Sequence, residues 1–322
     1  MILAEIQALS VTFASKKGPV RAVDAVDLSI DEGSIFGIAG ESGCGKTTIG
    51  LSLLGMIREP GRVDGKITVG GKDVTALRGE ERRLFRWKEV SMVFQGAMNS
   101  LNPVSNVGDQ ITEVILDHTG STRKEAMELA EGLLRKVRLP SDILRRYPHQ
   151  LSGGQKQRVV IAMAIALNPR LIIADEPTTA LDVVSQEHIL RLLKEVVKAS
   201  NTTVVIISHD LSLIADMCDY LAVMYLGRVV ESGRARDILA APAHPYTMAL
   251  LESNITLDRR GKKVESIPGY PPSPINLPRN CRFSGRCAFA TSECFESDPP
   301  ASKLDDGRTV YCYHPRYGND AK

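Results

Sequence analysis

Residues 40–47 read Gly-Glu-Ser-Gly-Cys-Gly-Lys-Thr, which fits the phosphate-loop pattern G-x-x-x-x-G-K-[ST]. The apolar run Ile35–Ala39 comes directly before this loop, and a helical pattern at 48–56 follows it. Glycines let backbone N–H groups turn inward around phosphates, and the N-terminus of a helix favours negative charge. The alternative is a glycine-rich turn with a chance lysine, and the strand–loop–helix context argues against it. The stretch predicts a nucleotide-binding loop.

Two side chains of this loop have chemistry of their own. The Lys46 ammonium is expected to bridge the β- and γ-phosphates, and the Thr47 hydroxyl to ligate Mg²⁺. A pair of acids follows another apolar run at 171–174. Asp175, at the end of that run, suits a water-mediated contact with Mg²⁺, and Glu176 suits polarising an attacking water. A solvated strand end is the alternative for such paired acids, and the phosphate loop upstream argues against it.

Four short apolar runs, each followed by a break and a helical pattern, predict the fold class. They lie at 35–39, 90–94, 171–174 and 204–207. Runs this apolar are typical of strands buried on both faces, so we expect an α/β fold with a parallel sheet flanked by helices. Between the second and third runs, Thr122 and Glu125 have the spacing of a capping box before a helical pattern. This predicts a helical insert at roughly 96–150.

The composition is that of an ordinary globular protein. The chain has 322 residues, which suggests about two structural units, and 40 basic against 38 acidic residues leave a net charge of +2. These values exclude general disorder and a strongly basic nucleic-acid binder. The longest strongly apolar run, 159–167, is far shorter than the roughly 20 residues that a bilayer span requires. No signal peptide is visible, so we expect a cytoplasmic protein unless a partner holds it at a membrane.

Cysteine and proline are concentrated near the C-terminus. Of the 17 prolines, 8 lie in 266–322, and four cysteines lie there too, so we place a compositional boundary near residue 265. The four cysteines are Cys281, Cys287, Cys294 and Cys312. A segment this small needs a metal or cross-links to fold. Zinc sites favour closer cysteine pairs than these, whereas wide spacing suits an iron–sulfur cube; zinc and free thiols remain alternatives.

The remaining motifs identify a family. Residues 151–155 read Leu-Ser-Gly-Gly-Gln, Gln95 ends an apolar run, and Ala180-Leu181-Asp182 and Ser208-His209-Asp210 follow the paired acids. In this order they resemble the nucleotide-binding subunits of ATP-binding-cassette (ABC) transporters. The resemblance implies a P-loop NTPase core, with a RecA-like sheet and an antiparallel β-subdomain. It also implies a head-to-tail dimer, in which each ATP lies between Lys46 of one subunit and the Ser152 loop of the other.

The resemblance also implies the roles of individual residues. Gln95 would sense Mg²⁺ and the attacking water, Glu176 would be the general base, and His209 would contact the γ-phosphate. Phe13 lies near the position of the adenine-stacking aromatic, although a phenylalanine on a strand is usually a core residue. The expected nucleotide-binding residues are Phe13, Gly40, Ser42, Gly43, Cys44, Gly45, Lys46, Thr47, Thr48, Asp175, Ser152, Gly153, Gly154 and Gln155, with Thr47 and Gln95 at the Mg²⁺.

Further segments resemble one branch of the family, the oligopeptide, dipeptide and nickel importer ATPases. They are 95–103, 147–150, 244–247 and the cysteine segment. Relatives usually have Asp-Pro where this chain has Gly96-Ala97, and members of the branch also move oligosaccharides. The branch implies a 4Fe–4S cluster, a second and homologous ATPase, two membrane permeases and an extracytoplasmic solute-binding protein. The chain would then sit on the cytoplasmic face of the membrane.

On this basis we divide the chain into an ATPase core at 1–95 and 151–235, a helical subdomain at 96–150 and a C-terminal module at 236–322. The competing functions are a DNA-repair ATPase and a translation-factor ATPase. The first needs a long coiled coil between the phosphate loop and Gln150, where no sustained heptads occur. The second normally carries two cassettes in one chain, and this chain has one.

Cys44 is expected to be a reactive thiol. It lies at a helix N-terminus beside Lys46, an environment that lowers the pKa of a thiol. The alternative is an inert small residue that fills a variable position of the motif.

Overall fold

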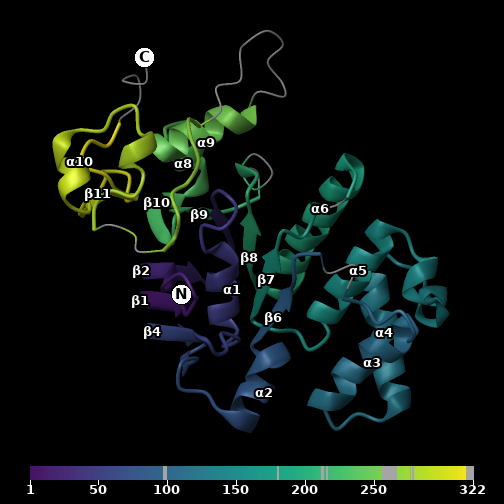
Figure 1. The fold of residues 1–322 in the computed structure, drawn as a ribbon. Coiled ribbons are helices and arrows are strands. Elements are labelled where there is room, and N and C mark those ends of the chain that lie inside the picture. Colours follow the sequence, from purple (N-terminus) through teal and green to yellow (C-terminus); the bar gives the residue numbers. More distant parts are fainter. Residues whose placement is uncertain are drawn as a thin grey trace.

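The computed structural model describes residues 1–96, 100–179, 181–211, 214, 217–255, 267–275, 277 and 279–316. Two sheets and a group of helices form these parts of the chain (Figure 1). The larger sheet has the strand order β11-β12-β10-β9-β3-β8-β7-β6, and the smaller has β2-β1-β4-β5. Within the described residues, no helix has both the length and the apolar character that crossing a bilayer needs.

The centre of the larger sheet is parallel. It consists of β6 (Val90–Val93), β7 (Leu171–Asp175), β8 (Thr203–Ser208), β3 (Ile35–Ala39) and β9 (Tyr220–Tyr225). The first four match the four apolar runs, and nearly all of their residues are buried. The predicted α/β class with a buried parallel sheet is therefore confirmed.

Helices cover both faces of this sheet. On one face, Ile49 of α1 (Lys46–Leu53) shares a core cluster with Ile173 and Ile207. On the other, Val159 of α5 (Gly153–Ala164) packs in the cluster that contains Ile172 and Ile206. Because side chains alternate along a strand, neighbouring isoleucines serve opposite helices. Helix α6 (Val183–Ser200) lies on the α5 side (Figure 1).

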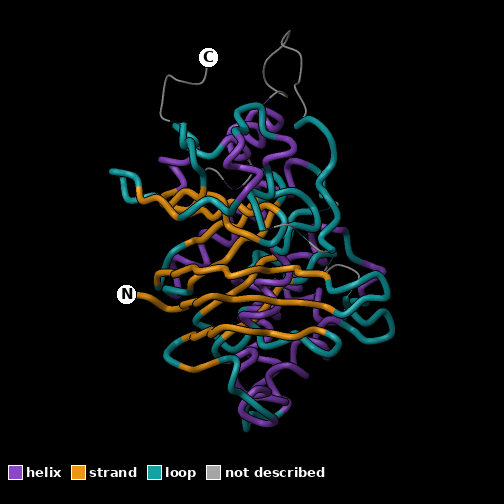
Figure 2. Tube along the Cα trace, turned by 60° about the vertical axis from the view of Figure 1, so that its left-hand side comes forward, coloured by secondary structure: helices purple, strands orange, loops and turns teal. Residues whose placement is uncertain are grey.

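The smaller sheet is antiparallel and lies beside the α1 face. Long strands β1 (Ile2–Phe13) and β2 (Val20–Asp31) pair with each other, and β4 (Gly61–Val69) pairs with β1 (Figure 2). The short strand β5 (Lys72–Asp73) closes the edge, and α2 (Gly79–Lys88) leads back to β6.

The segment between β6 and α5 is helical. It contains α3 (Val107–His118), α4 (Arg123–Lys136) and the 3₁₀ turns η2 (Ser141–Arg145) and η3 (Pro148–Gln150). The Thr122 hydroxyl oxygen accepts from the Glu125 N–H, and the Glu125 carboxylate accepts from the Thr122 N–H. These two bonds form the capping box that the sequence predicted. In Figure 1 these helices stand beside α5, away from the smaller sheet.

The chain after β9 continues the larger sheet. Strand β10 (Arg228–Arg234) pairs with β9, and after α8 (Ala235–Ala240) and α9 (Pro245–Ile255) the chain returns to it. There η4 (Ser284–Arg286) and α10 (Ser292–Glu296) precede β11 (Ala301–Lys303) and β12 (Thr309–Tyr311). Because β12 pairs with β10, the cysteine-containing segment is hydrogen-bonded to the same sheet as β3 and the phosphate loop.

Candidate nucleotide-binding site

The phosphate loop joins β3 to α1 in a conformation that only glycine adopts readily. Gly40 and Gly45 have φ angles of 152° and 105°. A Cβ at Gly40 would lie 2.2 Å from the Met224 carbonyl oxygen, and one at Gly45 would lie 2.2 Å from that of Ala22. The left-handed backbone and the close neighbours together explain both glycines. Gly45 is also the N-cap of α1, and no side chain caps that helix end. The first N–H groups of α1 are therefore free of a side-chain cap.

Lys46 is buried and folded back along the loop. Its Nζ donates to the carbonyl oxygens of Gly40 at 2.7 Å and Glu41 at 3.0 Å. These two bonds hold the ammonium against the loop backbone, and a phosphate oxygen can replace a carbonyl as its partner.

Asp175, at the end of β7, lies beside Thr47 and is 1% exposed. Burial raises the pKa of its carboxyl group, while a hydrogen bond from Thr47 opposes that shift. Its Oδ1 has no hydrogen-bond partner in the described part of the protein. A buried, unsatisfied carboxylate oxygen is costly, and a hydroxyl and a carboxylate are hard oxygen ligands of the kind that Mg²⁺ uses. The residues present therefore fit a Mg²⁺ ion.

Glu176 stands at the centre of a polar cluster drawn from three strand ends. Its carboxylate accepts from Gln95 Nε2 at 2.8 Å and from the Thr179 hydroxyl at 3.0 Å. His209 Nδ1 lies 2.8 Å from Glu176 Oε1 and donates when that nitrogen carries the proton. The three predicted catalytic residues, which follow β6, β7 and β8, are thus brought into direct contact. Thr179 was not foreseen; a hydroxyl three residues after the acid was its only signal in the sequence.

The charge of Glu176 follows from these contacts. Burial by itself would raise the pKa of the carboxyl group, but the bonds from His209 and Thr179 hold the pKa below its ordinary value. The carboxylate is therefore ionised at neutral pH and can accept a proton from a water. Its backbone φ of 45° is unusual for a residue with a side chain, and such conformations are found at functional sites.

The Ser152 loop caps α5. Ser152 Oγ accepts from the Gln155 N–H at 3.3 Å, and Gln155 Oε1 accepts from the Ser152 N–H at 3.0 Å, forming a capping box. Ser152 and Gly153 are exposed, and Gly154 lies close to Ser185. The described contacts of this helix end do not include the phosphate loop, which lies on the α1 face of the sheet.

Cys44 differs from the prediction. Its side chain is 3% exposed and belongs to the core cluster of the α1 face. Burial raises the pKa of the thiol, and the nearby Lys46 only partly offsets this effect. The prediction of a reactive thiol was wrong because the helix end and the lysine act on a group that has been removed from water.

The other predicted nucleotide-binding positions differ in exposure. Phe13, at the end of β1, is half-buried and packs with the core cluster of the α1 face. Ser42 is exposed and Thr48 half-buried within the loop and helix. Ala97 and Ala180, from the segments compared with family loops, lie outside the described residues.

The C-terminal cysteines come together. Cys281 and Cys294 are joined through the backbone, where the Cys281 N–H donates to the Cys294 carbonyl at 3.1 Å. All four thiols are free and line a single cavity, together with His244, Pro245, Phe283, Ser284, Phe289, Tyr313 and His314.

These thiols also influence one another's ionisation. Burial raises the pKa of Cys312 to about 11, and the proximity of the other three cysteines adds to this shift. In the described residues, no three His, Cys, Asp or Glu side chains are placed to hold a metal ion. The four thiols therefore share one cavity, but among the described residues they are not placed as ligands of a bound metal ion.

Two family models match the chain. The model described as "ABC transporter" matches residues 23–179, which include the phosphate loop, the Ser152 loop and the paired acids. The model described as "Oligopeptide/dipeptide transporter, C-terminal region" matches residues 230–294, which include three of the four clustered cysteines.

Curated relatives match over nearly the full chain. The oligopeptide transport ATP-binding protein OppD of Salmonella typhimurium is 41% identical over 98% of this chain and 94% of its own length. The dipeptide transport ATP-binding protein DppD of Escherichia coli is 43% identical over 98% of this chain and 97% of its own length.

Among solved structures, a dimeric ATP-binding cassette named MJ0796, in a post-hydrolysis state bound to ADP and phosphate, matches with a TM-score of 0.65 and 28% identity. The match covers 72% of this chain and 99% of that one. The fold, the family models and the identity over the whole length agree. The chain belongs to the ABC transporter ATPase family, in the group of the oligopeptide and dipeptide transport ATP-binding proteins.

Proposed function

We propose that this chain hydrolyses ATP to energise an importer of oligopeptides or dipeptides. The observation that carries the proposal is the contact of Glu176 with Gln95 and His209 beside the phosphate loop. Relatives at 41–43% identity are named as ATP-binding proteins of oligopeptide and dipeptide transport, which supports the solute class.

In the proposed mechanism, each group acts on one part of the nucleotide. Lys46 exchanges its bond to a loop carbonyl for one to the phosphates, and the N–H groups of α1 bind their oxygens. Mg²⁺ would be held by Thr47, with Asp175 and Gln95 reaching it directly or through water, and it would neutralise phosphate charge. Glu176 accepts a proton from the attacking water, and His209 and Gln95 orient that water and the γ-phosphate.

The exposed and already capped N-terminus of α5 supports a second subunit in the active assembly. Ser152, Gly153, Gly154 and Gln155 would bind the nucleotide held by the partner's phosphate loop. The dimeric solved relative supports this arrangement. We expect the partner to be a homologous ATPase, with two membrane permeases and a solute-binding protein completing the importer and holding this chain at the cytoplasmic face of the membrane. Phe13 would contact adenine.

Transport by the assembled complex tests this function. The chain would be co-expressed with two permeases and a second ATPase, and purified complexes placed in vesicles with the solute-binding protein. We expect ATP-dependent uptake of labelled dipeptides or oligopeptides. Uptake of oligosaccharides but not peptides would contradict the solute class, and pull-down of nucleic acid in place of permeases would favour a repair or translation ATPase.

We also propose that Cys281, Cys287, Cys294 and Cys312 hold a 4Fe–4S cluster with a structural role, with zinc as the alternative. The shared cavity and the four free thiols support this assignment. Protein purified without oxygen should be brown and contain about four irons per chain. Cys287→Ser should lose the iron, whereas the matched control Cys218→Ser, which changes a half-buried thiol outside the cavity, should keep it. Colourless protein with stoichiometric zinc would contradict the cluster.

A further inference from the structure

An acidic residue of the phosphate loop is paired with an arginine from the cysteine segment. Glu41 directly follows Gly40, and its two carboxylate oxygens accept from Arg286 Nη1 at 2.8 Å and Nη2 at 3.0 Å. The two residues are 245 positions apart, and the Arg286 side chain is only 7% exposed. Since the Glu41 side chain is 24% exposed, the pair is partly buried, and its bidentate geometry makes it stronger and more specific than an exposed ion pair.

The surrounding contacts keep both partners in place. Arg286 also donates to the Tyr225 hydroxyl at 3.2 Å and to the Pro268 carbonyl at 2.8 Å. The Glu41 N–H donates to the Tyr246 hydroxyl at 2.9 Å. Arg286 is thus the donor to both Glu41 and Tyr225, and a guanidinium group remains protonated in proteins.

Arg286 occupies a defined place in the cysteine segment. It ends the short turn η4, which lies between Cys281 and Cys287, and the Cys287 N–H bonds back to Ser284 in the same turn. The backbone of Arg286 is therefore part of the same turn as these two cysteines.

The pairing matters because of what the loop binds. The triphosphate of ATP carries several negative charges, and a carboxylate within the loop that holds them repels them. This repulsion is substantial close to a protein surface, where the effective dielectric constant is well below that of water. A guanidinium group on the same carboxylate cancels the repulsion and leaves Lys46 as the net charge facing the phosphates.

We infer that Arg286 is a positioning residue for ATP binding: it neutralises Glu41 and makes the affinity of the phosphate loop depend on the folded cysteine segment. The inference rests on the proposed ATPase function and adds to it a link between the cysteine cavity and the nucleotide site.

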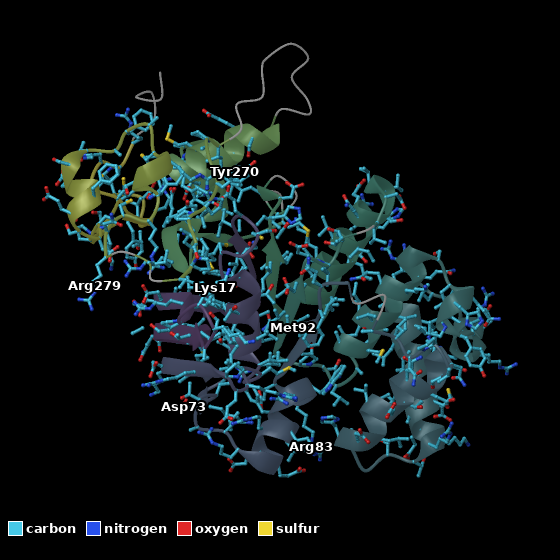
Figure 3. All side chains as sticks on the ribbon, in the orientation of Figure 1. Lys17, Asp73, Arg83, Met92, Tyr270 and Arg279 are labelled. Carbon is cyan, nitrogen blue, oxygen red and sulfur yellow. The ribbon has the colours of Figure 1, made fainter. Side chains whose placement is uncertain are left out.

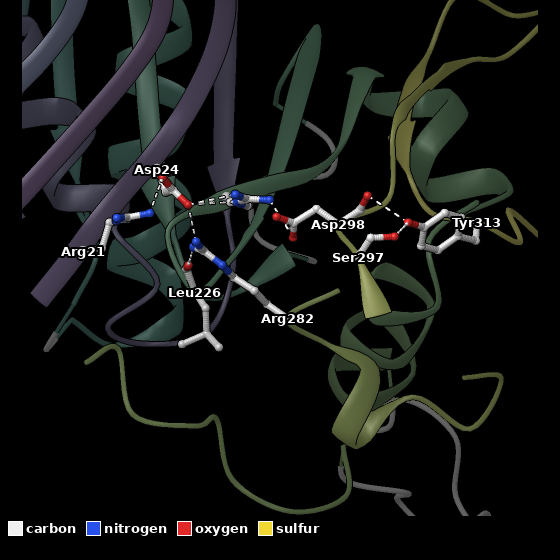
Figure 4. Close-up of polar contacts among 8 residues, drawn as sticks. Arg21, Asp24, Leu226, Arg282, Ser297, Asp298 and Tyr313 are labelled. Carbon is white, nitrogen blue, oxygen red and sulfur yellow. Dashed lines mark hydrogen bonds and ion pairs between the residues drawn. The ribbon is translucent and has the colours of Figure 1, made fainter. Parts of the chain in front are cut away.

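A second ion-pair group provides the matched control. Arg282, four residues earlier and 5% exposed in its side chain, pairs with Asp24 of β2 and donates to the Leu226 carbonyl (Figure 4). Arg228 joins Asp24 to Asp298 of the cysteine segment, at 2.9 Å and 2.8 Å. These bonds hold the same segment on the same core, and none of them is made to a side chain of the phosphate loop.

The test measures steady-state ATP hydrolysis by the assembled complex. Arg286→Met should raise the KM for MgATP by about tenfold while kcat stays near the wild-type value, because binding is weakened without a change in the chemical step. The double variant Arg286→Met/Glu41→Gln should return KM close to wild type, because the repelling charge is gone as well. A double variant as poor as Arg286→Met would contradict the inference.

Two control variants separate charge from structure. Arg282→Met should lower the melting temperature of the chain but leave KM unchanged. Arg279→Met should change neither, because Arg279 is exposed and its side chain extends away from the body of the protein (Figure 3). An equal rise in KM for Arg282→Met and Arg286→Met would show a purely structural role and overturn the inference.

A single-residue measurement covers the case in which Arg286→Met does not fold. Glu41→Gln alone should lower the KM for MgATP, because the charge of Arg286 then stands unopposed beside the loop. An unchanged or higher KM would contradict the inference. Failure of the proposed function looks different, since wild-type protein would then show no ATP hydrolysis that depends on Lys46.

Discussion

Helices α1 and α5 both begin at a glycine-rich loop, but their N-termini differ in side-chain capping. Helix α1 starts after Gly45 with no side chain as a cap, while Lys46 lies over the loop. Helix α5 starts after Ser152, and a reciprocal pair of side-chain bonds satisfies the N–H groups of Gln155 and Ser152. One helix end thus has no side-chain cap, and the other has a capping box that needs no ligand.

The difference shows how one subunit divides its binding surfaces. An uncapped helix end costs stability until an anion occupies it, so it belongs where the nucleotide is bound most of the time. A capped end remains stable when nothing is bound, so it suits a surface that meets its ligand only when two subunits close. Substitutions at the two helix ends should therefore have different effects.

Glu176→Gln removes the proposed general base and leaves the N-termini of α1 and α5 unchanged. We expect kcat for ATP hydrolysis to fall by about 10²–10⁴-fold, because the amide cannot accept the proton of the attacking water. Nucleotide binding should persist, and the ATP-bound dimer should accumulate on gel filtration. Phosphate release measures turnover, and the exposed Glu187→Gln on α6 serves as the control. Hydrolysis at the wild-type rate would exclude Glu176 as the base.

Lys46→Ala removes the positive charge at the uncapped N-terminus of α1. Loss of the charge on the phosphates should weaken nucleotide binding by about tenfold to a hundredfold, even in the isolated subunit. Titration with a fluorescent ATP analogue measures the dissociation constant. Lys124→Ala, on the exposed surface of α4, is the matched control and should bind normally. Equal affinity in the two variants would contradict the proposed role of α1.

Two substitutions at Ser152 separate the capping role from the proposed nucleotide contact. Ser152→Ala should cost about 1 kcal/mol of stability, whereas Ser152→Gly should cost only a few tenths, because glycine is a tolerated N-cap. Both should lower the ATPase rate of the dimer and leave nucleotide binding by the single subunit unchanged. Denaturant unfolding and phosphate release give the two readouts. If Ser152→Gly hydrolyses ATP normally, the hydroxyl has no contact with the partner's nucleotide.

The labelling rate of Cys44 measures how accessible the phosphate loop before α1 is to solvent. Because burial raises the pKa of its thiol, little thiolate is present at pH 8, and labelling by a maleimide should be slower than for a free thiol. The rate should continue to rise with pH beyond the point at which an exposed cysteine levels off. Mass spectrometry of the labelled peptide gives the rate. Labelling as fast as free cysteine at pH 8 would mean that the loop opens readily.

Local patterns in the sequence were good predictors of local structure. The apolar runs became β3, β6, β7 and β8, and Thr122 with Glu125 forms the predicted capping box. In each case the deciding interactions join residues a few positions apart or depend on a continuous apolar run. Glu176 was chosen for its place after a buried apolar run, whereas Gln95 and His209 came from a resemblance to a family, since 81 and 33 positions separate them from Glu176.

The sequence alone determined the phosphate loop, four buried strands of the parallel core and the cap of α4, because these depend on short-range hydrogen bonds and periodicity. Only the tertiary structure decided that Cys44 is buried and that Glu41 is paired with Arg286. Burial and charge pairing depend on which distant segments meet. The C-terminal segment returns to β10 and places an arginine on the phosphate loop, and no local pattern in residues 40–47 encodes that return.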